Sequence, residues 1–176
     1  MPYIHREGSC SCCRALTRRG MLLGAGALAL SPRLVLAASG NYEAMVLTCI
    51  DPRMQEPAHR YLATRGLTGQ YSQFTFAGAA IGVVAPKFAD WHKTFWDNLA
   101  ASIELHNIKS VIAIDHRDCG AAKIAYGDAS IATPEKEDAT HRAALTQFRQ
   151  EVGQRHKSLQ VETMLMALDG TVVKLG

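Results

Sequence analysis

The sequence predicts a three-layer α/β domain, with a mainly parallel sheet flanked by helices and a C-terminal hairpin. Short apolar runs of strand length alternate with longer segments of helical periodicity, which is the pattern of a parallel sheet covered on both faces. Near the C-terminus, two further runs are joined by Asp169-Gly170, a turn sequence typical of a β-hairpin. At 176 residues and 48% hydrophobic composition, the chain suits one domain with a substantial core.

The first 37 residues are predicted to be an export signal that does not belong to this domain. A basic region ending at Thr17-Arg18-Arg19 precedes an apolar run at 21–30 and a small-residue stretch ending at Ala37-Ala38. This order describes a secretory signal, and the paired arginines resemble the twin-arginine signal. The apolar run is too short for a membrane span, which needs about 20 apolar residues. We therefore expect cleavage, a periplasmic or exported location and no stable membrane anchor.

Removal of the signal leaves one domain, residues 38–176, and changes its charge. The signal carries five of the 19 basic residues and one of the 16 acidic residues, so 14 basic and 15 acidic residues remain and the formal charge falls from +3 to −1. The domain therefore has no electrostatic basis for binding nucleic acid. Cys10, Cys12 and Cys13 leave with the signal, so Cys49 and Cys119 are the cysteines of the domain.

Three runs predict the parallel strands in chain order. Residues 44–48 and 110–114 are nearly continuous apolar runs, as expected where helices cover both faces of a strand. Between them, residues 73–76 alternate polar and apolar side chains and predict the second strand. This strand runs into a small-residue segment at 77–82, which we expect to form a loop.

Helical periodicity predicts the layers that cover the sheet. A short helix is expected at 58–65, because Pro57 allows a helix to start and Gly66 allows it to end. A long helix is expected at 86–106, where apolar side chains recur at three- and four-residue steps. These side chains are Phe88, Trp91, Phe95, Leu99 and Ile103. We interpret this stripe as core or as a subunit contact, and together with the short chain it favours a homodimer or a higher homo-oligomer.

The remaining segments complete the sheet and its layers. Residues 120–126 predict a short helix, and residues 135–155 predict a longer helix that is richer in charge. Residues 158–168 and 171–175 flank the Asp169-Gly170 turn and predict the two strands of the hairpin.

Two short cysteine-bearing fragments follow the first and third predicted strands. Cys49-Ile-Asp51-Pro-Arg53 and His116-Arg-Asp-Cys119-Gly120 begin 67 positions apart. In an open parallel sheet, ligands bind beyond the carboxyl ends of the strands, so we expect the two fragments to meet there. Two cysteines and a histidine are suitable ligands for a catalytic zinc ion, which keeps its fourth position for water.

These fragments resemble the motifs of the β-class carbonic anhydrases. The pattern Cys-x-Asp-x-Arg after the first strand, and His-x-x-Cys-Gly after a later apolar strand, are similar to that family over about residues 44–122. The short length and the form His-x-Asp-Cys-Gly resemble its compact branch, which also contains carbonyl sulfide and carbon disulfide hydrolases. The resemblance implies a β-carbonic-anhydrase-like fold, Zn²⁺ as the cofactor, and CO2 and bicarbonate as the small-molecule substrate and product.

The resemblance also implies a role for each motif residue. Cys49, His116 and Cys119 become the zinc ligands, and Asp51 and Arg53 become the catalytic dyad beside the metal. A zinc-bound hydroxide would hydrate CO2 reversibly, because the ion lowers the pKa of bound water from about 15.7 towards about 7. Arg53 would hold Asp51 in a two-pronged ion pair, which leaves Asp51 free to accept a hydrogen bond from the hydroxide. In the resting form of the family, this aspartate instead binds the zinc.

Several residues depart from the family pattern or lie outside these roles. Asp115 stands where the family commonly has glycine, directly before the motif histidine. After the second strand the family usually has Arg-Asn-Ala-Gly-Asn, of which residues 76–80 keep only Ala-Gly. Asp118 lies inside the second motif. We expect it at most to contact a metal ligand, and not to bind the metal itself. We expect the other histidines of the domain to be solvated or to cap helices, except that His59, one turn past the first motif, is expected to be partly exposed without a role, with a proton relay as the alternative. They are His59, His92, His106, His141 and His156.

Three alternatives stay open from the sequence. The same site could act on carbonyl sulfide or carbon disulfide, depending on the width of the pocket. The altered segment at 77–80 also suits a non-catalytic domain that zinc stabilises. In an oxidising compartment Cys49 and Cys119 could form a disulfide in a binding module, although a disulfide explains neither His116 nor the Asp51–Arg53 pair.

Overall fold

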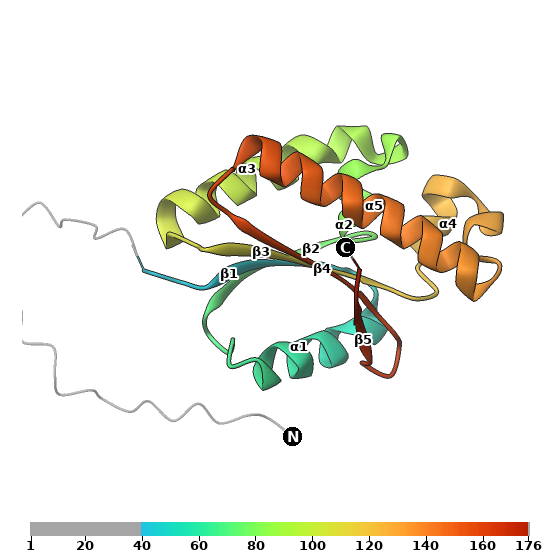
Figure 1. Cartoon of the computed structure of the whole chain (residues 1–176), viewed down its shortest axis with the longest axis horizontal. Coiled ribbons are helices and arrows are strands. Elements are labelled where there is room, and N and C mark those ends of the chain that lie inside the picture. Colours follow the sequence, from blue (N-terminus) through green and yellow to red (C-terminus); the bar gives the residue numbers. More distant parts are fainter. Residues whose placement is uncertain (1–39, 176) are drawn as a thin grey trace, which may run out of the picture. The chain divides into compact units, whose positions relative to one another are not determined.

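A five-stranded sheet forms the centre of the fold, which a computed structural model describes for residues 40–175 (Figure 1). The strand order is β2-β1-β3-β4-β5. The first four strands run parallel and β5 pairs antiparallel with β4. The strands are β1 (Ala44–Cys49), β2 (Tyr71–Phe76), β3 (Ser110–His116), β4 (Gln160–Met166) and β5 (Val172–Lys174). The expected export signal, with Cys10, Cys12 and Cys13, lies outside the described residues.

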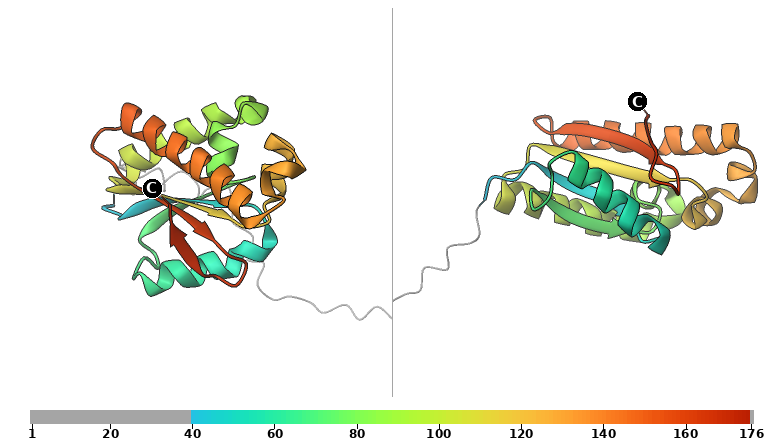
Figure 2. Two further views of the ribbon diagram at one scale, coloured as in Figure 1. Left: turned by 45° about the vertical axis from the view of Figure 1, so that its right-hand side comes forward. Right: turned by 90° about the horizontal axis from the view of Figure 1, so that it is seen from below.

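Helices cover both faces of this sheet, which confirms the three-layer prediction (Figures 1 and 2). One face carries α1, the opposite face carries α2, α3 and α5, and α4 follows the carboxyl end of β3. The helices are α1 (Gln55–Thr64), α2 (Ala80–Val84), α3 (Ala89–His106), α4 (Gly120–Tyr126) and α5 (Pro134–Arg155). Short 3-10 turns lie at Pro52–Met54, Pro86–Phe88 and Asp128–Ile131. Among residues 40–175, no helix combines the length and the apolar character that crossing a membrane requires.

The central strand β1 is buried along its whole length. None of its six residues is more than 4% exposed. Met45 and Leu47 pack with the α2, α3 and α5 side, whereas Ala44 and Val46 pack with α1, because successive side chains of a strand point to opposite faces. The continuous apolar run therefore reports a strand covered on both faces, as predicted.

The connections around β1 and β3 create a crevice at the carboxyl end of the sheet. From β1 the chain passes through α1 to β2 on one side, and from β3 it passes through α4 and α5 to β4 on the other side. Adjacent strands whose connections diverge in this way mark the switch point of an open α/β sheet, where ligands bind. Both cysteine fragments leave the sheet at this point.

One sequence prediction was wrong in detail. The segment 77–82 was expected to be a loop, but α2 begins at Ala80, and all five of its residues are buried. Burial of this short apolar segment against α3 and α5 favours a helix, which satisfies its backbone groups internally. Trp91 of the predicted apolar stripe is 41% exposed and stacks on Phe88, so it lies outside the core of this chain and its role as a subunit contact stays a prediction.

Candidate metal centre

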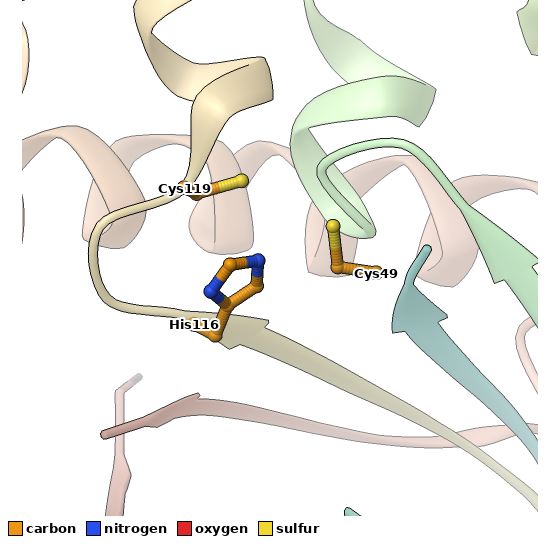
Figure 3. Close-up of side chains that lie close together, drawn as sticks. All are labelled: Cys49, His116 and Cys119. Atoms are coloured by element: carbon orange, nitrogen blue, oxygen red, sulfur yellow. The ribbon is translucent and has the colours of Figure 1, made fainter. Parts of the chain in front are cut away.

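Three predicted ligands converge at the switch point (Figure 3). Cys49 is the last residue of β1, His116 is the last residue of β3, and Cys119 immediately precedes α4. Their ligand atoms all lie within 4.8 Å of one another, and none of the three residues is more than 4% exposed. Both cysteines are free thiols in this structure, so no disulfide joins them.

The first loop is shaped by its own short sequence. Asp51 caps the 3-10 turn at Pro52–Met54, where its Oδ1 accepts the backbone N–H of Arg53 at 2.9 Å. Pro52 favours this geometry, because it restricts the preceding residue to extended backbone and suits the first helical position. Gln55 donates from Nε2 to the carbonyls of Cys49 and Asp51, at 3.2 and 3.1 Å. These bonds fix the turn that presents Cys49 and Asp51 to the crevice.

The second loop reverses the chain so that Cys119 faces His116. Asp118 has φ +54°, a left-handed conformation that aspartate tolerates better than most residues. Arg117 pairs with Glu137 at 2.9 Å and with Asp138 at 2.6 Å, and Glu137 also accepts the N–H of Asp118. The first turn of α5 therefore holds this loop in place.

The imidazole of His116 is oriented as a ligand. Its Nδ1 donates to the carbonyl of Arg117 at 2.8 Å, which leaves Nε2 with the free lone pair. Nε2 is buried and has no hydrogen-bond partner among residues 40–175. A buried polar atom without a partner is costly, and metal-binding histidines commonly donate their other ring nitrogen to a carbonyl. The orientation therefore fits a metal ion on the Nε2 side.

The two sulfur atoms favour a bound cation. The neighbouring Cys119 and His116 side chains, with the N–H groups of Asp51 and Gly78, lower the pKa of Cys49 to about 4 against the opposing effect of burial. The neighbouring Cys49 thiolate and burial raise the pKa of Cys119. A divalent cation removes this conflict, because it allows both sulfur atoms to be thiolates. One nitrogen and two sulfur donors form a set that suits zinc and leaves a position open.

Asp51 and Arg53 lie beside the three ligands as a pair. Arg53 donates from Nε at 3.0 Å to Oδ1 and from Nη2 at 2.7 Å to Oδ2 of Asp51. These hydrogen bonds with Arg53 lower the pKa of Asp51 to about 2. Oδ2 of Asp51 also lies 4.0 Å from Nε2 of His116. The carboxylate is therefore held by the arginine at the edge of the candidate metal position.

Asp118 links the two motif loops, a role that sequence reasoning did not foresee. Its Oδ2 accepts Nη1 of Arg53 at 2.9 Å, its carbonyl accepts Nη2 at 3.1 Å, and Lys123 donates to Oδ1 at 3.1 Å. Arg53 thereby bridges two aspartates from different loops. The position of Asp118 inside the second motif was the available signal, but its partner is 65 residues away in the sequence.

Asp115 turns away from the candidate metal ligands. Its Oδ1 accepts the N–H of Ala80 at 2.9 Å, and its Oδ2 accepts Nδ1 of His141 at 2.8 Å. The expectation that His141 is solvated or caps a helix was wrong, because this residue is 0% exposed. It lies on the face of α5 that also buries Leu145 and Phe148. A buried aspartate requires a partner, but the sequence does not reveal which residue supplies it.

A largely apolar pocket opens beside the ligands. Its volume is about 330 Å³. Ile50 and Ile124 contribute to its lining although they are 57% and 62% exposed. The complete lining is Cys49, Ile50, Asp51, Pro52, Ala77, Gly120, Ala121 and Ile124. A small apolar molecule could therefore reach the ligands and the Asp51 carboxylate.

Comparison with known proteins assigns a family to this arrangement. A family model described as "putative carbonic anhydrase" matches residues 39–173. The chain belongs to this carbonic anhydrase family. An uncharacterized protein of Rickettsia conorii is 34% identical over 131 residues, which cover 74% of this chain and 70% of the relative.

Solved β-carbonic anhydrases share the fold. CafA of Aspergillus fumigatus matches with a TM-score of 0.51 and 16% identity, covering 80% of this chain and 78% of its own. A chain from crystal structures of two tetrameric β-carbonic anhydrases of Sordaria macrospora matches with a TM-score of 0.51 and 14% identity, covering 80% and 84%. The predicted β-carbonic-anhydrase-like fold is therefore confirmed.

Proposed function

We propose that this protein is a zinc-dependent enzyme that reversibly hydrates CO2 to bicarbonate. The observation that carries the proposal is the buried Cys49–His116–Cys119 cluster, with the Asp51 carboxylate 4.0 Å from the free ring nitrogen of His116. Membership of a carbonic anhydrase family supports the reaction type.

In this proposal, the two cysteines and the histidine hold zinc through Sγ of Cys49, Sγ of Cys119 and Nε2 of His116. When bound, zinc supplies an activated water as the nucleophile, because it lowers the pKa of that water towards about 7. The buried position of the three ligands excludes bulk water from their side of the site. The apolar pocket opens on the other side of the site.

Asp51 orients the nucleophile. Its pKa is about 2, so it remains a carboxylate at neutral pH and can only accept hydrogen bonds. The bonds from Arg53 leave further acceptor capacity on the carboxylate oxygens, and Oδ2 faces the histidine ligand. A hydrogen bond accepted at this atom directs the nucleophile's lone pair towards the substrate. Arg53 keeps the carboxylate from moving onto the metal position.

The pocket binds a small apolar substrate. Ile50, Pro52, Ala77 and Ile124 supply apolar surface within a volume of about 330 Å³, which suits CO2. The same lining also admits carbonyl sulfide and carbon disulfide, which are linear and apolar as well. Hydrolysis of these sulfur analogues is therefore the second candidate function.

The active form is a homo-oligomer, which we propose from two observations. Ile50 and Ile124 are large apolar side chains exposed beside the pocket, and exposed apolar patches commonly mark contact surfaces. The similar Sordaria macrospora enzymes are tetrameric. The export signal predicted at residues 1–37 leads us to propose a periplasmic location. Sedimentation analysis of the purified protein tests the oligomer, and cell fractionation tests the location.

Metal analysis combined with two activity assays tests the function. We expect about one zinc ion per chain and rapid CO2 hydration in stopped-flow measurements. Faster turnover of carbonyl sulfide than of CO2 would instead favour the second candidate. Zinc without either activity would indicate a non-catalytic zinc domain, and protein that binds no zinc would contradict the proposal altogether.

A further inference from the structure

We infer that the buried Asp115–His141 pair is a positioning device for the metal centre, which orients the loop that contacts Cys49 and the strand that carries His116. This inference rests on the proposed zinc site. The pair is separate from the ligands and from the Asp51–Arg53 dyad. It acts on the candidate ligands through the backbone that it holds.

The pair joins three elements of the fold. Both side chains are 0% exposed. Asp115 belongs to β3 and uses one carboxylate oxygen for the first residue of α2, Ala80, at 2.9 Å. It uses the other oxygen for His141 on α5, at 2.8 Å. His141 therefore fixes the orientation of the carboxylate, and the carboxylate fixes the start of α2 relative to β3.

The start of α2 is directly connected to the Cys49 sulfur. Gly78, two residues before Ala80, donates its N–H to Sγ of Cys49 at 3.3 Å. Between them, Ala79 has φ +48° and is fully buried, a conformation that non-glycine residues rarely adopt. A backbone held in such a conformation must be fixed from both sides. Here the Cys49 sulfur fixes one side and Asp115 fixes the other.

The loop is also confined by α4. A Cβ atom added to Gly78 would lie 2.8 Å from Cβ of Ala121, so the loop packs closely against the helix that follows Cys119. Release of Ala80 by Asp115 would therefore shift the Gly78 N–H relative to the Cys49 sulfur. Asp115 also precedes His116 in β3, and both are paired with β4 at Leu165 and Met166. A change at Asp115 thus affects two of the three ligands.

Stability alone does not explain a buried polar pair at this position. Replacing both partners of a buried hydrogen bond by apolar groups of similar shape can be nearly neutral or stabilising. His141 bonds to Asp115 through Nδ1, while its Nε2 is buried without a partner among residues 40–175. A side chain that served only to fill the core would not need a buried ring nitrogen that lacks a hydrogen-bond partner. Orientation of Asp115 accounts for the histidine directly.

Four variants of the full chain test the inference. His141→Ala removes the bond to Asp115, and His141→Asn keeps a side-chain N–H close to the position of Nδ1. Asp115→Asn keeps the shape of the side chain but leaves a single acceptor oxygen. Leu145→Ala is the matched control, because it removes buried volume from the same helix, one turn further on. Each protein is loaded with zinc or with Co²⁺ and its thermal midpoint is measured.

The measurements are the rate of zinc loss to a chelator and the absorption spectrum of the Co²⁺ form, which reports ligand geometry. We expect His141→Ala to release zinc about tenfold faster, the lower end of the effect of residues that orient metal ligands, and to shift the Co²⁺ spectrum. Asp115→Asn should change both in the same direction, and His141→Asn should restore both. Leu145→Ala should retain the wild-type spectrum and rate at an equal loss of thermal stability.

Equal rates and spectra for His141→Ala and Leu145→Ala would overturn the inference, since the pair would then serve only the core. If His141→Ala does not fold, an unchanged rate and spectrum in Asp115→Asn would overturn it equally. A wild-type chain that binds neither zinc nor Co²⁺ would refute the proposed function instead, so the two failures are distinguishable.

Discussion

The two ends of the parallel sheet each carry a histidine beside small polar side chains, but its surroundings differ between the two ends. At the amino end, Nδ1 of His106 lies 2.6 Å from Oγ of Ser72, which also accepts a bond from Ser102 at 3.0 Å. At the carboxyl end, Nε2 of His116 has no hydrogen-bond partner in the described chain and faces two buried thiols. Polar groups at one end satisfy one another, whereas those at the other end are arranged for a ligand.

The connectivity of the sheet explains this difference. The connections of β1 and β3 diverge at the carboxyl end and leave a crevice between the two strands. At the amino end, the C-terminus of α3 packs beside the start of β2 and fills the corresponding space with Ser102 and His106. Four predictions test how far the two ends differ, from the largest expected effect to the smallest.

Replacement of a ligand should abolish metal binding at the carboxyl end alone. The free energy of zinc binding to a protein site is about 10–16 kcal/mol and is shared among the ligands. Loss of one ligand in Cys119→Ala should therefore weaken zinc affinity on the order of 1000-fold. The matched variant His106→Ala removes a histidine from the amino end and should leave zinc affinity unchanged. Competition with a chelator measures both constants. Equal zinc affinity in the two variants would show that Cys119 is not a zinc ligand.

Replacement of Asp51 should separate catalysis from metal binding. Asp51→Ala should retain zinc but lower CO2 hydration about 100-fold, the lower end of the usual contribution of a positioned acid–base group. Asp97→Ala is the control, because Asp97 also pairs with a basic neighbour, Lys93, but lies on the exposed side of α3. Stopped-flow turnover at equal zinc content measures the effect. Wild-type turnover in Asp51→Ala would refute the dyad.

Zinc affinity should rise with pH, because two ligands bind protons that the metal must displace. The Cys49 thiolate and burial raise the pKa of Cys119. Burial lowers the pKa of His116, but the neighbouring Cys49 outweighs it, so this pKa is also raised. Below each raised pKa the proton competes with zinc, so affinity should increase by about tenfold per pH unit for each proton. Zinc titrations at several pH values measure the slope, and a flat profile would contradict these assignments.

Replacement of Asp118 should have the smallest effect on the site. Its ion pair with Arg53 is largely exposed, with side chains 45% and 53% accessible, and exposed pairs contribute little. Arg53 keeps its bonds to Asp51 in Asp118→Ala, so turnover should fall by less than about fivefold. Steady-state hydration measurements test this value. A loss as large as that in Asp51→Ala would show that Arg53 depends on both aspartates.

Most of the fold was predictable because its signals are local. The apolar runs of β1 and β3, the helix at Gly120–Tyr126 and the Asp169-Gly170 turn each lie within a few neighbouring residues. The prediction failed at α2, where burial depends on distant elements. Small side chains such as those from Ala77 to Gly82 suit both a loop and a buried helix, and only the packing against α3 and α5 decides between them.

The sequence by itself determined the parallel architecture and the three candidate ligands, because strand periodicity and motif spacing are properties of contiguous residues. Only the tertiary structure decided which partners hold those ligands. Asp115 meets His141 across 26 positions, and Arg53 meets Asp118 across 65. Such pairs depend on how β3, α5 and the two loops pack, and side-chain chemistry alone permits many alternatives. The identity of the ligands is therefore local information, whereas their orientation is set by the assembled fold.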